Sequence, residues 1–179
     1  MKNRLLETGE KFKMKFKKVG GGEFFGQILD IPDTSRVSNF LSARRYLRTR
    51  PNTSVVPADV MIANGKKYIV AEHGDGFFKE VIYKHFKLFE VDHEFTWARK
   101  AQVENPVTGV METSLTPQIT TVYISMQPKS DIEDSINIPQ QTYTAISNIE
   151  VFRGETIDRY VVLKVDQVLG VYLLEMKEK

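Results

Sequence analysis

Cysteine is absent from this chain of 179 residues. A chain without cysteine forms no disulfide, holds no iron–sulfur cluster or zinc–thiolate site, and uses no cysteine nucleophile. Long apolar runs are also absent, because stretches such as Val168 to Leu174 fall far short of the roughly 20 residues that a membrane helix needs. The first residues show no apolar core of a secretory signal. These absences predict a soluble intracellular protein with no membrane partner.

The sequence has the composition of an ordinary globular protein, with 41% hydrophobic and 27% charged residues. Its charges are unevenly spread along the chain. The net charge is +2, yet the first 50 residues carry 12 basic and 5 acidic side chains, whereas residues 101–179 carry 6 basic and 11 acidic ones. A polarised chain suits head-to-tail contacts between copies, or a basic region that faces phosphate. Charges that intermix on folding are the alternative.

Alternation of apolar and polar residues dominates the pattern and predicts strands. The run from Lys11 to Lys17 alternates strictly, which places its apolar side chains on one face of a strand. The pair Asn64-Gly65, between two β-branched runs, predicts a hairpin over Asp59 to Ala71. Residues 77–91 fit one or two strands, or a helix over 79–89. Other strands are expected at 23–31, 95–103, 110–115, 119–126, 143–152, 160–165 and 168–176, with turns at 20–22, 73–76, 104–109, 153–155 and 166–167.

Residues 32–57 break this alternation. From Ser35 to Thr49, apolar residues recur near helical spacing, and Pro51 follows, which predicts a short amphipathic helix or an ordered loop. Arginines are interspersed with aromatic residues in this segment. Their guanidinium groups could bind a phosphate backbone or the carboxylates of a neighbouring subunit. A solvated helix face is the alternative. The candidate DNA or partner contacts are Arg36, Arg44, Arg45, Arg48 and Arg50, with no acidic residue between positions 34 and 58.

Residues 127–141 are polar and weakly periodic, which predicts a long loop. Two stretches, Asp59 to Ala71 and Ile149 to Val162, each combine a strand, a glycine turn and a Tyr-x-Val strand, a hint that the C-terminal strands echo the earlier ones. We therefore predict a mainly β fold: a small antiparallel β-barrel or sandwich at 1–95, with a basic loop or helix insertion at 32–57. Residues 96–179 add further strands, which pack on it or form a second small domain.

Motifs for catalysis are weak. The glycines at 20–22 and 26 lack the spacing of a P-loop or of a dinucleotide fingerprint. His73 near Asp75, and His93 between Asp92 and Glu94, suggest a metal, but neighbours on a strand point to opposite faces. No nucleophile elbow is present. We predict that the protein is not an enzyme and has no catalytic residue, cofactor or metal.

The stretch from Pro57 to Val70, which follows the basic insertion, resembles the small β-barrels of head-to-tail connector (neck) proteins of tailed bacteriophages, of the stopper or head-closure type. In that family a strand, a glycine turn and a Tyr-x-Val strand close the barrel. A long insertion between early strands projects toward the axis of a ring. The similarity covers residues 10–95.

The resemblance implies a virion structural protein that is assembled in the host cytoplasm. Its copies would form a ring between the portal or adaptor proteins and the tail-tube or tail-terminator proteins. DNA would pass through the channel of this ring, and the arginines would contact the DNA or a neighbouring subunit.

Two other functions stay open on the residues alone. One is a nucleic-acid-binding β-barrel module, and the other is an enzyme whose site the sequence does not reveal. A ring oligomer favours the connector, because a module can act alone. Stacking aromatic rings on an exposed sheet face favour the module, and a pocket with perturbed carboxylates favours the enzyme.

Overall fold

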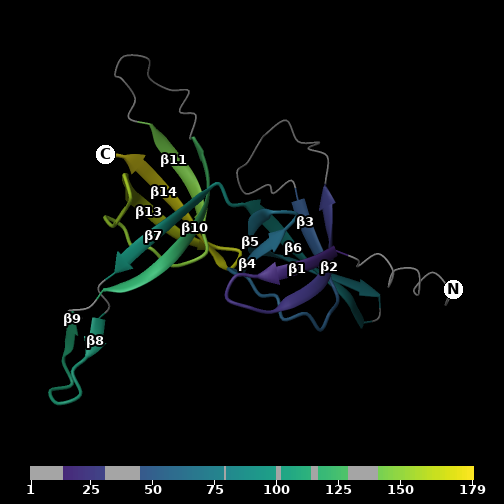
Figure 1. The fold of residues 1–179 in the computed structure, drawn as a ribbon, viewed down its shortest axis with the longest axis horizontal. Coiled ribbons are helices and arrows are strands. Elements are labelled where there is room, and N and C mark those ends of the chain that lie inside the picture. Colours follow the sequence, from purple (N-terminus) through teal and green to yellow (C-terminus); the bar gives the residue numbers. More distant parts are fainter. Residues whose placement is uncertain (1–13, 31–44, 79, 100–101, 114–116, 129–140) are drawn as a thin grey trace.

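A computed structural model describes residues 14–30, 45–78, 80–99, 102–113, 117–128 and 141–179. Over these ranges the chain forms antiparallel strands and no helix (Figure 1). The predicted mainly β, antiparallel fold is therefore confirmed. The described residues contain no helix that is long and apolar enough to cross a membrane.

The first six strands form a closed barrel, with the pairing order β1-β2-β3-β6-β5-β4. The barrel closes because β4 pairs with β5 on one side and with β1 on the other. Asn64 and Gly65 both have positive φ in the β4–β5 turn, as the Asn-Gly pair predicts. The strands are β1 (Met14–Lys18), β2 (Glu23–Asp30), β3 (Arg45–Thr49), β4 (Val60–Ala63), β5 (Lys66–Phe78) and β6 (Glu80–Glu90).

The later strands form a curved six-stranded sheet, called the second sheet here, which lies beside the barrel (Figure 1). Its order is β12-β13-β14-β11-β10-β7. A separate hairpin of β8 (Gln102–Glu104) and β9 (Met111–Thr113) follows β7. The strands of the second sheet are β7 (His93–Arg99), β10 (Gln118–Pro128), β11 (Thr142–Ser147), β12 (Thr156–Ile157), β13 (Tyr160–Val168) and β14 (Val171–Glu178).

The two sheets share one topology. Reading the second sheet from β7 gives the order β7-β10-β11-β14-β13-β12, which matches β1-β2-β3-β6-β5-β4 strand for strand. In each half, a segment outside the described residues separates the second strand from the third, at 31–44 and at 129–140. The equivalent pairs are therefore β1/β7, β2/β10, β3/β11, β4/β12, β5/β13 and β6/β14.

The turn before the fourth strand has the same backbone hydrogen bonds in both halves. In the barrel, Ala58 N donates to Val70 O at 2.8 Å, and Val70 N donates to Asp59 O at 2.9 Å. In the second sheet, Gly154 N donates to Val162 O at 2.8 Å, and Val162 N donates to Glu155 O at 2.9 Å. The resemblance between the two Tyr-x-Val stretches thus reflects equivalent backbone positions.

The acidic side chains of these turns are equivalent too. Asp59 accepts the Val56 amide at 2.8 Å and pairs with Lys18, at the end of β1, at 2.8 Å. Glu155 accepts the Phe152 amide at 2.7 Å and pairs with Arg99, at the end of β7, at 3.5 Å. In each half, this carboxylate ties the end of the first strand to the turn before the fourth.

Three apolar clusters organise the packing. One fills the barrel, around Phe16, Leu47 and Tyr68. A second lies against the inner face of the second sheet, around Trp97, Tyr160 and Leu174. The third joins the two halves, and we call it the junction: Val60, Ile69, Ala71 and Phe89 from the barrel, with Tyr123, Ile146 and Val171 from the second sheet.

The helix predicted over Ser35 to Thr49 is wrong for its last five residues, which form β3. Residues 35–44 lie outside the described ranges. β3 pairs along its whole length with β2 and with β6, and the two ladders satisfy the backbone groups that a helix would have bonded internally. Leu47 and Thr49 are buried while Arg48 is not, which is the alternation of a strand.

Two predicted turns are also wrong. Residues 73–76 lie within β5, where the pairing with β6 shifts between Glu72 and Gly74 and leaves His73 as a bulge. The turn expected at 166–167 lies instead at Leu169-Gly170, both with positive φ. The alternative helix over 79–89 is replaced by β6. Of the loop predicted over 127–141, residues 127 and 128 extend β10, and 129–140 lie outside the described residues.

Thr49 carries a buried hydroxyl without a partner. Its side chain is fully buried, and within the described structure Oγ1 makes no hydrogen bond. We expect Thr49→Val to raise the free energy of unfolding by about 1–2 kcal/mol, because valine keeps the shape and removes the desolvated hydroxyl. Chemical denaturation measures this change.

Ser147 provides the control, because it occupies the equivalent buried position in β11. Its hydroxyl donates to Ile149 O at 2.8 Å and accepts from Ile149 N at 3.2 Å. Ser147→Ala is therefore expected to destabilise the protein. A loss of stability in Thr49→Val as large as that in Ser147→Ala would contradict the assignment of Thr49.

Candidate functional site

The five predicted arginines do not form one group. Arg36 and Arg44 lie outside the described residues, Arg45 and Arg48 lie in β3, and Arg50 follows β3 on the exposed surface. Because side chains alternate along a strand, Arg45 shares a face with Leu47, whereas Arg48 points to the opposite, outer face of the barrel.

Arg45 serves as a tie at the end of the barrel. Its Nε donates to Asp30 Oδ1 at 3.1 Å, and its guanidinium donates to Tyr68 Oη at 3.1 Å and to Glu90 at 2.8 Å. Although burial opposes the charge, Tyr68, Asp30 and Glu90 together raise the pKa of Arg45. A hydrogen bond from Lys66, with help from Arg45, lowers the pKa of Glu90. This network joins the ends of β2, β3, β5 and β6. The guanidinium of Arg45 therefore has a structural role within the barrel.

Arg48 belongs to a cluster of rings on the outer face of β3, β5 and β6. Its guanidinium lies 4.6 Å from the centre of the Tyr83 ring, and its Nε donates to His85 Nε2 at 2.9 Å. Nε2 of His85 accepts this bond through its lone pair. Tyr83 and His85 are themselves stacked at 4.6 Å.

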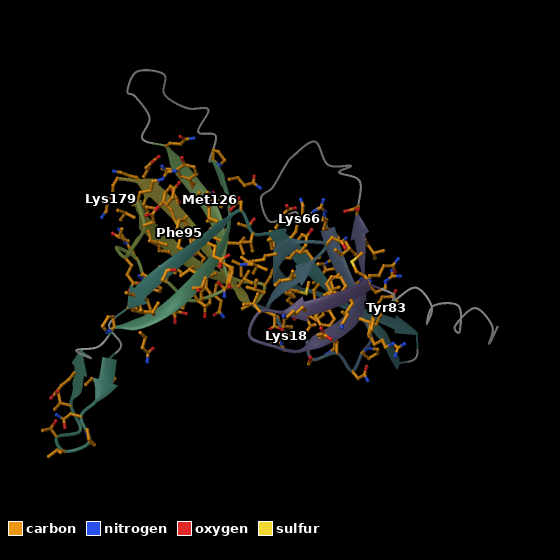
Figure 2. The ribbon with its side chains drawn as sticks, viewed as in Figure 1. Lys18, Lys66, Tyr83, Phe95, Met126 and Lys179 are labelled. Atoms are coloured by element: carbon orange, nitrogen blue, oxygen red, sulfur yellow. The ribbon has the colours of Figure 1, made fainter. Side chains whose placement is uncertain are left out.

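The cluster continues across the barrel surface to β5 and back to β3. The rings of His73 and His85 are 6.1 Å apart, and those of Tyr46 and His73 are 4.6 Å apart. Burial, and then the charge of Lys87, lower the pKa of His73. We call this cluster the outer patch: Tyr46, Arg48, His73, Tyr83 and His85. Tyr83 lies on the side of the barrel away from the second sheet (Figure 2).

A groove of about 550 Å³ lies at the neighbouring edge of the barrel. Phe25 and Arg50 line it, together with residues 52–54. The Phe25 side chain is 56% exposed, which is unusual for a large apolar ring. With the outer patch, it extends a surface of aromatic rings and guanidinium groups over the outer faces of β2, β3 and β6.

This surface is suited to binding. Aromatic and guanidinium planes stack on flat groups, and arginine and tyrosine are enriched where proteins contact one another. Among the described residues, no three histidine or acidic side chains gather closely enough to hold a metal ion. The described pairs Asp92–His93 and Lys67–Glu94 line one pocket where β6 leads into β7, and Asp92 accepts a hydrogen bond from the Met126 amide at 3.0 Å.

Sequence reasoning found Arg48 and Arg50 but missed Tyr83, His85 and His73 as their companions. Residues 85–88 alternate between polar and apolar, so His85 could have been assigned to the outer face of a strand, with Tyr83 two residues before it on the same face. Their proximity to Arg48 depends on the β3–β6 register, in which Arg48 pairs with His85, and on the bulge at His73.

No family model, curated protein sequence or solved structure matches this chain significantly.

Proposed function

We propose that this protein is a structural subunit of the ring that joins the head of a tailed bacteriophage to its tail and surrounds the DNA channel. The main observation that supports this proposal is the way in which the barrel closes. β4, the Asn64-Gly65 turn and the Tyr68-x-Val70 segment of β5 complete the barrel by pairing β4 with β1. This is the arrangement that the resemblance to stopper proteins implies.

The position of the insertion also supports the proposal. Of the insertion predicted at 32–57, residues 45–49 are strand β3 of the barrel itself, and residues 31–44 connect Asp30, the last residue of β2, to its pairing partner Arg45, the first residue of β3. The resemblance implies an insertion between early strands at such a place. The partners are other copies of this chain, portal or adaptor proteins on one side, and tail-tube or tail-terminator proteins on the other. Its location is the virion.

Binding to phage assemblies tests this function. The full-length protein is mixed with isolated portal rings or tail tubes, and the complexes are examined by electron microscopy. We expect a ring of this protein on one end of at least one assembly. If the protein bound neither the portal rings nor the tail tubes, the connector proposal would be overturned.

The outer patch favours a second candidate, a nucleic-acid-binding module. Tyr46, Tyr83 and the two histidines offer stacking surfaces beside Arg48, as in proteins that bind single strands through rings and cations. For a module, Arg48→Gln with Arg50→Gln should weaken DNA binding by the monomer. It should also reduce the slope of log affinity against log salt by about 0.7–0.9 per lost phosphate contact.

Fluorescence anisotropy with labelled single-stranded and double-stranded DNA separates the candidates. The matched control removes two cations from the second sheet, Arg153→Gln with Lys164→Gln. Tight binding of DNA by a monomer, lost only in the Arg48 and Arg50 variant, would favour the module. A connector subunit is expected to show weak DNA binding that both double variants alter equally.

A further inference from the structure

The junction is a contact between two different faces of equivalent sheets. The barrel contributes the outer face of β4, β5 and β6, through Val60, Ile69 and Phe89. The second sheet contributes the outer face of β10, β11 and β14, through Tyr123, Ile146 and Val171. We call the first kind of face the donor face and the second kind the acceptor face. Because the halves share one topology, each half has both faces, and the junction uses only one from each.

The unused acceptor face belongs to the barrel. Thr49 and Ser147 are equivalent buried positions, and from them the register places Arg48 where Ile146 lies and Phe25 where Tyr123 lies. Arg48 pairs with His85 as Ile146 pairs with Leu173. The barrel's acceptor face therefore carries Phe25, Arg48, Tyr83 and His85, which are the exposed ring and much of the outer patch.

The unused donor face belongs to the second sheet. The repeated hydrogen bonds make Val70 equivalent to Val162, so Ile69 is equivalent to Val161. Val60 pairs with Ile69 as Thr156 pairs with Val161, and Ile69 pairs with Phe89 as Val161 pairs with Lys177. In the junction, Ile69 is fully buried and Val60 is 5% exposed. Thr156, Val161 and Lys177 are only half-buried.

We propose that a second copy of this chain docks its second-sheet donor face on the barrel acceptor face, and so repeats the junction between molecules. The contact joins unlike faces, so each copy keeps one face of each kind available. Contacts of this kind propagate head to tail, and they form a ring when the rotation closes.

One pair of side-chain positions in the junction has a direct counterpart in this arrangement. Lys67 Nζ lies 5.0 Å from the centre of the Tyr123 ring. Arg159 is equivalent to Lys67, because each precedes the tyrosine of a Tyr-x-Val segment, and Phe25 is equivalent to Tyr123. Phe25 is 56% exposed, and the Arg159 side chain is 60% exposed. Within one chain Arg159 donates to Tyr160 Oη at 3.0 Å and pairs with Glu178 at 3.2 Å, so docking would bring position 159 of one copy beside Phe25 of the next without requiring a new arginine–ring contact.

The ion pair of the junction has no such counterpart. Lys67 pairs with Glu94, but the position equivalent to Glu94 is Lys15, which pairs with Glu23 at 2.7 Å. The contact between copies is therefore expected to depend on Arg48, Tyr83 and His85 of the outer patch, which cysteine substitutions at positions 25 and 159 leave in place. This inference deepens the proposed function, since it identifies the faces that would build the ring, and it rests on that function only for ring closure.

Cysteine crosslinking tests whether the two faces meet between copies. The sequence has no cysteine, so only the introduced thiols can react. The variant carrying both Phe25→Cys and Arg159→Cys is treated with a short bis-maleimide at a concentration of the order of 100 µM. We expect a ladder of covalent oligomers. Either single variant should remain mainly monomeric, and a mixture of the two single variants should stop at the dimer. Replacing Arg159→Cys by Val107→Cys, in the exposed β8–β9 turn, gives a control without a ladder.

A single variant that crosslinks to itself as well as the double variant does would indicate a symmetric dimer and overturn the proposal. So would the absence of a ladder, or a DNA-binding monomer whose outer patch is blocked by nucleic acid. If the ladder forms but portal rings and tail tubes do not bind, the connector function fails and the contact between copies stands. If those assemblies bind and no ladder forms even on them, the connector function stands and the face assignment is wrong.

Discussion

Gly170→Ala is expected to lower the free energy of unfolding by about 2–5 kcal/mol, which is large for the addition of one methyl group. Gly170 has a φ of +73°, where an L side chain costs about 1–2 kcal/mol. A Cβ atom there would lie 2.4 Å from Pro57 Cβ, and overpacking against the rigid ring of proline adds about 1–3 kcal/mol. The two halves would have to move apart at this point.

Gly154→Ala separates the two contributions. Gly154 has a φ of +86°, but a Cβ atom there would meet nothing within 4 Å. Gly154→Ala should therefore lower the free energy of unfolding only by the contribution from backbone strain. Urea denaturation of both variants measures the difference. Equal losses would mean that the contact between Pro57 and the β13–β14 turn has no role in joining the halves.

Ile69→Ala is expected to cost about 2–5 kcal/mol, because it removes a fully buried side chain from the junction and leaves a cavity. The chain has one tryptophan, Trp97, which lies in the core of the second sheet and is 9% exposed. Its fluorescence thus reports on the second sheet alone. If the halves unfold together, a substitution in the barrel will lower the urea midpoint of the Trp97 transition.

Val161→Ala is the matched control, at the equivalent position of the second sheet. Val161 is half-buried in the single chain, so dilute protein should lose much less stability. A Trp97 midpoint that ignores Ile69→Ala would contradict a shared junction, because it would mean that the second sheet is stable without the barrel.

The strands followed from local patterns wherever one face alone is buried. In β1, Phe16 is buried between exposed Lys15 and Lys17, as the alternation predicts. The β4–β5 hairpin followed from Asn64-Gly65, since both residues adopt the positive φ that this turn requires. These features depend only on neighbours in the sequence, which is why the sequence predicts them.

The errors occur where pairing between distant strands overrides the local pattern. Residues 45–49 were compatible with helical spacing, but β2 and β6 bind them on both sides. The glycines at 74 and 76 indicated a turn, yet they pair with β6 and continue the strand past a bulge. Neither outcome can be derived without knowing which strands are neighbours.

The candidate site was predictable only in part for the same reason. The arginines were evident as a group, but strand alternation separates Arg45 from Arg48 and gives them different roles. Tyr83 and His85 lie far from Arg48 in the sequence, and only the register of β3 and β6 brings them together. The repeated topology was hinted at by two short stretches, while the equivalence of the strands required the pairing order of both sheets.

The order of the strands along the chain has a consequence for biosynthesis. All six barrel strands lie between residues 14 and 90, so the barrel can close on the ribosome before the second sheet has been made. At that stage Val60, Ile69 and Phe89 have no cover, because Tyr123, Ile146 and Val171 have not yet been added. The nascent chain therefore exposes an apolar surface that is prone to aggregation. We expect chaperones to bind this surface until translation is complete.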